Sequence, residues 1–166
     1  MAGFIAARHL SVLWLALMLL ASAGLAQKHL GELRAKFNQE TDPVRRARAM
    51  PKLGDALLDQ MGEQLQKGGV EAALRTLEEY REAVAMSHSG LKASGINAEK
   101  KSNGFKQLEI HVRRGVRRLE HLIVAVPLEQ REAFEEIQKQ LEQVDRELIE
   151  MLFPRRPSQQ EPKPKS

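Results

Sequence analysis

The chain has 166 residues and no cysteine, with 26 Lys and Arg residues against 22 Asp and Glu residues, a formal net charge of +4. Without cysteine, the sequence excludes disulfides, thiol catalysis and attachment of a lipid to an N-terminal cysteine. Aromatic residues make up only 4% of the chain, and this scarcity of stacking side chains, together with the modest charge, argues against a nucleic-acid-binding protein.

The chain opens with the pattern of a secretory signal peptide. A basic start at Arg8 is followed by an uncharged run over residues 10–20 and then by small residues, which is the order found in export leaders. Cleavage is expected after Ala26, with Ala23 as the alternative site. Removal of residues 1–26 takes away one basic residue and no acidic one, which leaves a mature chain of formal charge +3.

An uncleaved membrane anchor is the second interpretation of this segment. Residues 10–26 form a stretch of 17 residues, at the short end of the roughly 17 to 25 that a membrane-spanning helix needs. In both interpretations the remaining chain is exported, and it is expected in the periplasm or secreted. Membrane contact is expected only through this segment, if it is not removed.

Residues 27–153 are expected to form one all-α domain. Apolar residues recur there at spacings of three and four, and no run alternates as a strand would. The pattern predicts an antiparallel bundle of four to five helices, the first of them short and running from about residue 28 to 39. A disordered tail rich in Pro, Lys and Arg is expected over residues 154–166, because it can bury almost nothing.

The second helix is expected to begin at Asp42 and to continue to about Lys67. Asp42 suits the N-cap and Pro43 the first helical position, where a missing N–H is no loss. Pro51 inside this helix is predicted to kink or break it.

A third helix is predicted from about Val70, because Gly68 and Gly69 form a strong stop before it. Residues 87–104 hold three glycines and four serines, and this is expected to be the loosest internal segment, partly frayed helix and partly loop.

The last two helices are expected to form a C-terminal hairpin. Residues 105–126 and the segment after Pro127 each carry apolar side chains in a regular three-four alternation, but the two series are out of phase by one residue across the proline. A break at Pro127 therefore favours a hairpin over a single kinked rod. The expected packing positions are Phe105, Leu108, Val112, Leu119, Leu122 and Val126, then Phe134, Ile137, Leu141, Val144, Leu148 and Met151.

The stretch HVRRGVRRLEH is the candidate anion- or partner-binding surface. At 100° per residue, one arc of the helix carries a set of basic side chains, namely Arg113, Arg114, Arg117, Arg118 and His121. Residues 97–126 have a net charge of +4 and residues 127–153 a net charge of −5. Ion pairs between these arginines and Glu142 or Glu150 of the neighbouring helix are therefore expected.

No pattern of catalytic, cofactor-binding or metal-ligating residues is found. The histidines lack the three- or four-residue spacing to a further ligand that helical metal sites use, and they are expected at the surface. The sequence has no G-x-S-x-G motif and no glycine-rich phosphate loop between strand and helix. The chain is therefore expected to bind no cofactor or metal and to be no enzyme.

Two segments resemble the helices of a tetratricopeptide repeat. Residues 53–58 read LGDALL, and residues 68–74 read GGVEAAL, similar to the L-G that opens the first helix of that repeat and the G-x-x-x-x-A-L that begins its second. The similarity covers about a quarter of the mature chain, with some seven extra residues in the first helix and no second copy. The resemblance implies a protein-interaction adaptor.

Binding or scaffolding through helix faces is the function that these features favour. A protein partner or self-association is expected, because regular apolar series serve pairing within or between chains. The alternative is an electrostatic module, in which the arginine arc and the basic tail hold an anionic surface or polymer.

Overall fold

A computed structural model of the protein describes residues 27–154. The expected signal peptide at residues 1–26 and the tail from residue 155 lie outside the described residues. The chain divides into two units, Met1–Gln39 and Glu40–Ser166. In the first unit, the described residues 27–39 form a helix.

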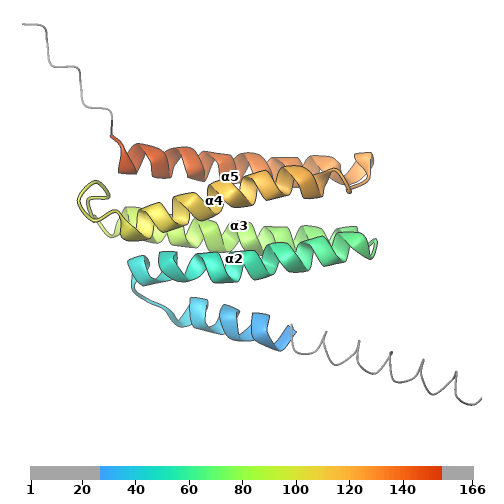
Figure 1. The fold of residues 1–166 in the computed structure, drawn as a ribbon, viewed down its shortest axis with the longest axis horizontal. Coiled ribbons are helices and arrows are strands. Elements are labelled where there is room, and N and C mark those ends of the chain that lie inside the picture. The colour runs from blue at the N-terminus through green and yellow to red at the C-terminus, as the bar shows by residue number, and fades with distance from the viewer. Residues whose placement is uncertain (1–26, 155–166) are drawn as a thin grey trace, which may run out of the picture. The chain divides into compact units, whose positions relative to one another are not determined.

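The second unit is a four-helix bundle (Figure 1). Its elements are α2 (Pro43–Gln66), α3 (Val70–Ala93), α4 (Asn103–Ile123), the short 3₁₀ turn η1 (Leu128–Gln130) and α5 (Arg131–Leu152). The described residues contain no strand. The prediction of an all-α antiparallel bundle is confirmed, and so is the hairpin, since α4 and α5 pack against each other across the turn that contains Pro127.

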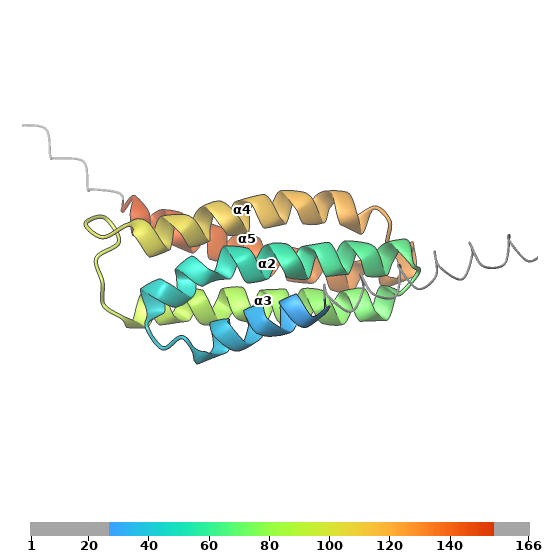
Figure 2. The ribbon, with the colours of Figure 1, turned by 60° about the horizontal axis from the view of Figure 1, so that its bottom comes forward.

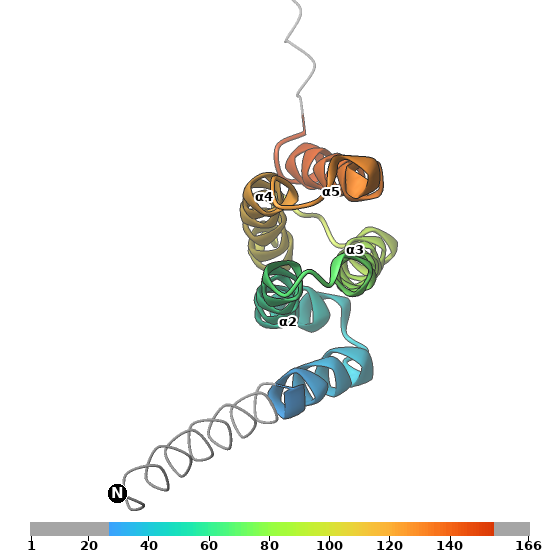
Figure 3. The same ribbon diagram turned by 90° about the vertical axis from the view of Figure 1, so that its right-hand side faces the viewer.

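The four helices are two hairpins lying side by side. Viewed along the bundle, they occupy the corners of a square, in the order α2, α3, α5, α4 (Figure 3). Successive helices run in opposite directions, so α2 is parallel to its neighbour α4 (Figure 1). The hairpins α2–α3 and α4–α5 thus stack with their first helices together and their second helices together.

The predicted helix boundaries of α2 follow from local chemistry. The Asp42 carboxylate accepts a hydrogen bond of 2.7 Å from the Arg45 N–H, as an N-cap should. The turn after the helix uses Gly68 with φ of +75°, a conformation that favours glycine. Pro51 does not break α2, which remains one helix and bends in its N-terminal third (Figure 2).

Residues 87–104, predicted to be partly helix and partly loop, divide equally between the two. Helix α3 continues to Ala93, so the connection to α4 covers only residues 94–102. Ser87 is fully buried, and its hydroxyl donates to the Ala83 carbonyl at 2.9 Å. Serine and glycine favour loops in isolation, but in the last turns of α3 the tertiary packing around Ser87 outweighs this local preference.

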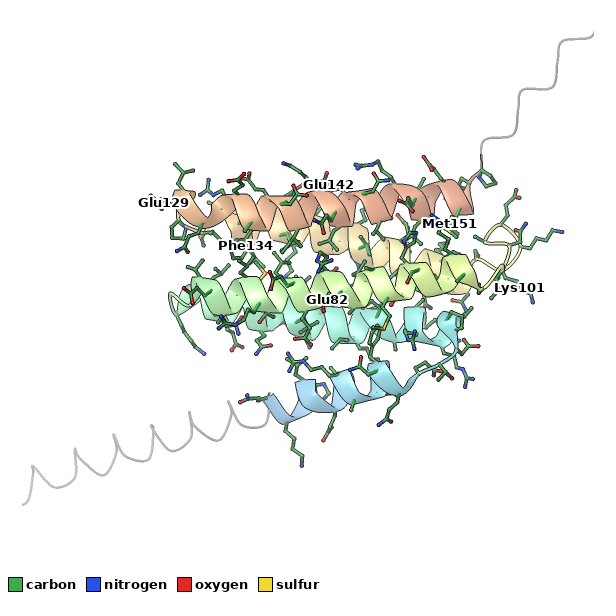
Figure 4. All side chains as sticks on the ribbon, turned by 180° about the vertical axis from the view of Figure 1, so that it is seen from behind. Glu82, Lys101, Glu129, Phe134, Glu142 and Met151 are labelled. Carbon is green, nitrogen blue, oxygen red and sulfur yellow. The ribbon has the colours of Figure 1, made fainter. Side chains whose placement is uncertain are left out.

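The core runs through the centre of the four helices. Most of the predicted packing positions on α4 and α5 are buried, whereas Leu122, Val144 and Met151 are half-buried. Phe134 points from α5 into the bundle and is 0% exposed (Figure 4). The apolar stripes therefore face one another, and the arginine-bearing side of α4 faces outward.

Candidate functional site

The arginine arc lies on α4, as predicted, with part of its charge neutralised by the bundle itself. An ion pair of 2.6 Å joins Arg118 Nη2 to Asp59 Oδ1 of α2. Another of 3.2 Å joins Arg113 Nη1 to Glu109 Oε1, one turn earlier on α4. These contacts are partly exposed, so each contributes little stability, on the order of 0.2–1 kcal/mol.

The expected pairing is wrong, because in the described part of the chain no basic side chain of the arc lies within ion-pair distance of Glu142 or Glu150. Glu142 lies 4.0 Å from Arg146 and accepts a hydrogen bond from Gln138, both on its own helix. Arg118 pairs with Asp59 of α2 instead, since α4 packs against α2 as well as against α5.

Arg114, Arg117 and His121 form the part of the arc without ion-pair partners. Within residues 27–154, none of the three has a carboxylate within 4.0 Å of a side-chain nitrogen. All three are exposed. This part of α4 therefore presents charge that the bundle does not neutralise.

The other edge of the arc borders Asp145 of α5. Burial raises the pKa of Asp145, while the positive charges of Arg113, Arg146 and Arg117 act in the opposite direction. Its Oδ1 atom is buried and has no hydrogen-bond partner among the described residues. Arg113 and Arg117 thus act on α5 through space, although they make no direct ion pair with it.

A groove lies between the N-terminal half of α4 and the C-terminal end of α5. Its volume is about 490 Å³. The groove is lined by apolar side chains, including Ile110, Ile149 and Phe153, and by charged side chains of both signs, namely Glu99, Lys106, Glu109 and Arg113. Phe153 is 73% exposed and Ile149 is 38% exposed. Aromatic side chains left in water beside a groove are typical of binding surfaces.

His111 is buried between the hairpins, contrary to the expectation that the histidines lie at the surface. Its side chain is 1% exposed, and Nε2 lies 3.3 Å from the Tyr80 hydroxyl of α3. The two rings meet edge to face, with centroids 5.7 Å apart. Nδ1 lies 3.7 Å from Asp55 Oδ1 of α2, which is too far for a hydrogen bond. Three helices thus contribute to one polar cluster.

The electrostatics of the polar cluster of Asp55, Tyr80 and His111 follow from burial. Burial lowers the pKa of His111 from 6.5 to about 4, against an opposing effect of the Asp55 carboxylate. Burial, assisted by Asp55, raises the pKa of Tyr80 well above its usual range. Both groups are therefore neutral at neutral pH. In the Nδ1-protonated tautomer, Nε2 accepts from the tyrosine hydroxyl and the Nδ1 proton faces Asp55.

Two glycines make room for this cluster. A Cβ atom at Gly54 would overlap the His111 ring and come within 2.9 Å of Tyr80 Cε2. A Cβ atom at Gly115 would overlap the Tyr80 hydroxyl. The sequence alone does not reveal that a polar cluster fills this space. A tyrosine and a histidine on buried helix faces, with glycines at neighbouring buried positions, are the available signal.

His88 is a second buried histidine, 8% exposed, between α3 and α5. Its Nε2 atom lies 3.5 Å from Glu147 Oε2, and Lys92 Nζ lies 3.3 Å from the same oxygen. Burial lowers the pKa of His88 in spite of Glu147. Hydrogen bonds from Gln143 and Lys92 lower the pKa of Glu147. His88 and Lys92 of α3 thus both face Glu147 of α5.

Comparisons of the chain with family models, with curated proteins and with solved structures give no match. Within residues 27–154, no cluster of three or more His, Asp or Glu side chains is arranged to hold a metal ion. In the same range, no helix is long and apolar enough to cross a membrane.

Proposed function

We propose that this chain is an exported, non-catalytic helical binding protein that recognises a segment of a protein partner in the groove between α4 and α5. The exposed Phe153 beside the groove is the observation that carries the proposal. Phe153 is 73% exposed, so a partner that covers this large apolar side chain gains binding free energy from the apolar surface that it buries.

The lining of the groove indicates the chemistry of that segment. Ile110, Ile149 and Phe153 provide an apolar surface, and the edge carries both signs of charge, with Lys106 and Arg113 beside Glu99 and Glu109. A helical or extended segment with an apolar anchor and polar flanks fits this pattern. The resemblance of residues 53–58 and 68–74 to a tetratricopeptide repeat favours the same kind of function, since it implies a protein-interaction adaptor.

The test is site-specific photo-crosslinking of the full chain in its native cells. A photoreactive amino acid at Phe153 is expected to give one defined heavier species, whereas the same group at Glu82, exposed on α3 (Figure 4), is expected to give none. Ile149→Lys should remove the crosslinked product at Phe153, because a charged side chain in the apolar lining of the groove would weaken binding of the partner. A product of twice the chain mass would identify the partner as a second copy. Equal products from both positions, or none from Phe153, would contradict the proposal.

A second candidate is an electrostatic module, and the unpaired guanidinium groups of Arg114 and Arg117 favour it. Arginines without ion-pair partners on one exposed arc attract phosphate, sulfate or carboxylate groups. The anionic partner would be a surface or a polymer, reached by α4 together with the basic tail.

Charge reversal separates the two candidates. The double variant Arg114→Glu with Arg117→Glu is compared with Arg75→Glu with Lys139→Glu, which changes the net charge equally at exposed positions on α3 and α5. The electrostatic candidate predicts that only the first variant loses its retention on a polyanion column at low salt. An equal shift for both variants would show a response to net charge alone and would remove this candidate.

A further inference from the structure

The contact between α2 and α4 joins the first helices of the two hairpins, and a histidine stands at its centre. His111 of α4 is 1% exposed and lies between Asp55 of α2 and Tyr80 of α3. Its Nδ1 atom is buried without a hydrogen-bond partner. Gly54 lets α2 approach so closely that no side chain separates it from the ring. The packing of α2 against α4 therefore depends on the protonation state of this ring.

We propose that His111 is an acid-sensitive latch between the two hairpins. The neutral ring holds α2 against α4, and protonation of the ring separates the hairpins while each keeps its helices. The latch lies outside the groove of the proposed function and does not depend on it.

The groups around the ring favour its neutral form in the closed bundle. On α2, Asp55 is the one group that attracts the proton, but its side chain is 64% exposed and screened by water. On α4, the positive charge of Arg114 opposes protonation, and no charged group of α5 contributes to the pKa of His111. On α3, Tyr80 offers a neutral hydroxyl, and an imidazolium would force it to turn its proton away.

The free-energy cost of protonating the buried ring therefore falls when the ring moves toward water on the side of Asp55. That movement needs α4 to withdraw from α2, since Gly54 already touches the ring. The pKa of the ring is about 4 in the closed bundle and 6.5 when the ring is exposed. Lowering the pH from 7.5 to 5 therefore raises the ratio of open to closed bundle about 30-fold.

The chain has no native cysteine, so single thiols can report the opening in the full chain. A Cβ atom at Gly62 of α2 would lie 3.5 Å from Leu122 of α4, so Gly62→Cys reports the contact between the hairpins. Thr76 of α3 bonds Gln64 of α2 at 2.8 Å, so Thr76→Cys reports the interior of one hairpin. Reaction with a disulfide reagent is measured at each pH relative to an unstructured thiol peptide.

The reactivity of Gly62→Cys is expected to rise about 30-fold from pH 7.5 to pH 5. At both pH values it should exceed the reactivity of Thr76→Cys, because separation of the hairpins exposes residue 62 whereas only unfolding of the α2–α3 hairpin exposes residue 76. Adding His111→Gln should abolish the rise. His88→Gln should preserve it, and this variant tests the assignment even if His111→Gln fails to fold. No rise at Gly62→Cys, a reactivity of Thr76→Cys as high as that of Gly62→Cys, or loss of the rise in His88→Gln would overturn the proposal.

Discussion

Lowering the pH from 7.5 to 5 is expected to reduce the free energy of unfolding by about 2 kcal/mol, and by about 3 kcal/mol at pH 4, through His111 alone. Burial lowers the pKa of this ring to about 4 in the bundle, against 6.5 for an exposed histidine. The unfolded chain therefore binds a proton at a higher pH than the folded chain does. The stability is fully present above pH 6.5 and is lost as the pH falls toward 4.

Urea denaturation followed by circular dichroism at several pH values measures this loss. His111→Gln is the reference, because it removes the titrating ring and leaves the carboxylates. Burial raises the pKa of Glu109 and of Asp145, so their protonation opposes the loss at the acid end, equally in both proteins. The free energies of the two proteins should converge by about 2 kcal/mol between pH 7.5 and pH 5. Parallel curves would contradict a buried neutral His111.

Replacing Gly54 with alanine is expected to lower the free energy of unfolding by about 3 kcal/mol. The new Cβ atom would overlap the His111 ring and come within 2.9 Å of Tyr80 Cε2, and overpacking of this kind costs about 1–3 kcal/mol. Displacing the ring also breaks the bond between Tyr80 and His111, which leaves buried polar atoms unpaired at a further cost of about 1–3 kcal/mol. The helical preference of alanine returns only about 0.5–1 kcal/mol.

Gly62→Ala is the matched control on the same helix. A Cβ atom there would meet Leu122 Cδ2 at 3.5 Å, an ordinary contact, so the helical preference alone should stabilise the bundle by about 0.5–1 kcal/mol. Thermal or urea unfolding should therefore move in opposite directions for the two variants. Stabilisation by both would mean that α2 does not approach His111 as closely as described.

The helical segments could be predicted because their signals are local. Asp42 and Pro43 begin α2, Gly68 ends its hairpin turn, and Pro127 separates α4 from α5. The series of apolar residues that includes Phe134 identifies the buried face of α5 in the same way. Each of these depends on neighbouring residues or on one helical period.

The site could be predicted only in part, because its contacts depend on which helices are neighbours. The arginine arc follows from the helical period, but the pairing of Arg118 with Asp59 requires α2 to lie beside α4. The charge difference between α4 and α5 favoured the wrong partner. His111 sits next to Val112 on the buried side of α4, yet the residue type alone favoured a surface position. Stacking of the hairpins decides both outcomes.

The titration of the His111 ring by nuclear magnetic resonance tests most directly that a polar cluster lies buried between the two hairpins. The imidazole nitrogen shifts of the full chain would be followed against pH, with His111→Gln assigning the signal. We predict a ring that stays neutral through pH 5 and titrates with a midpoint of about 4. A midpoint near 6.5 would place the ring in water and contradict this arrangement of the hairpins.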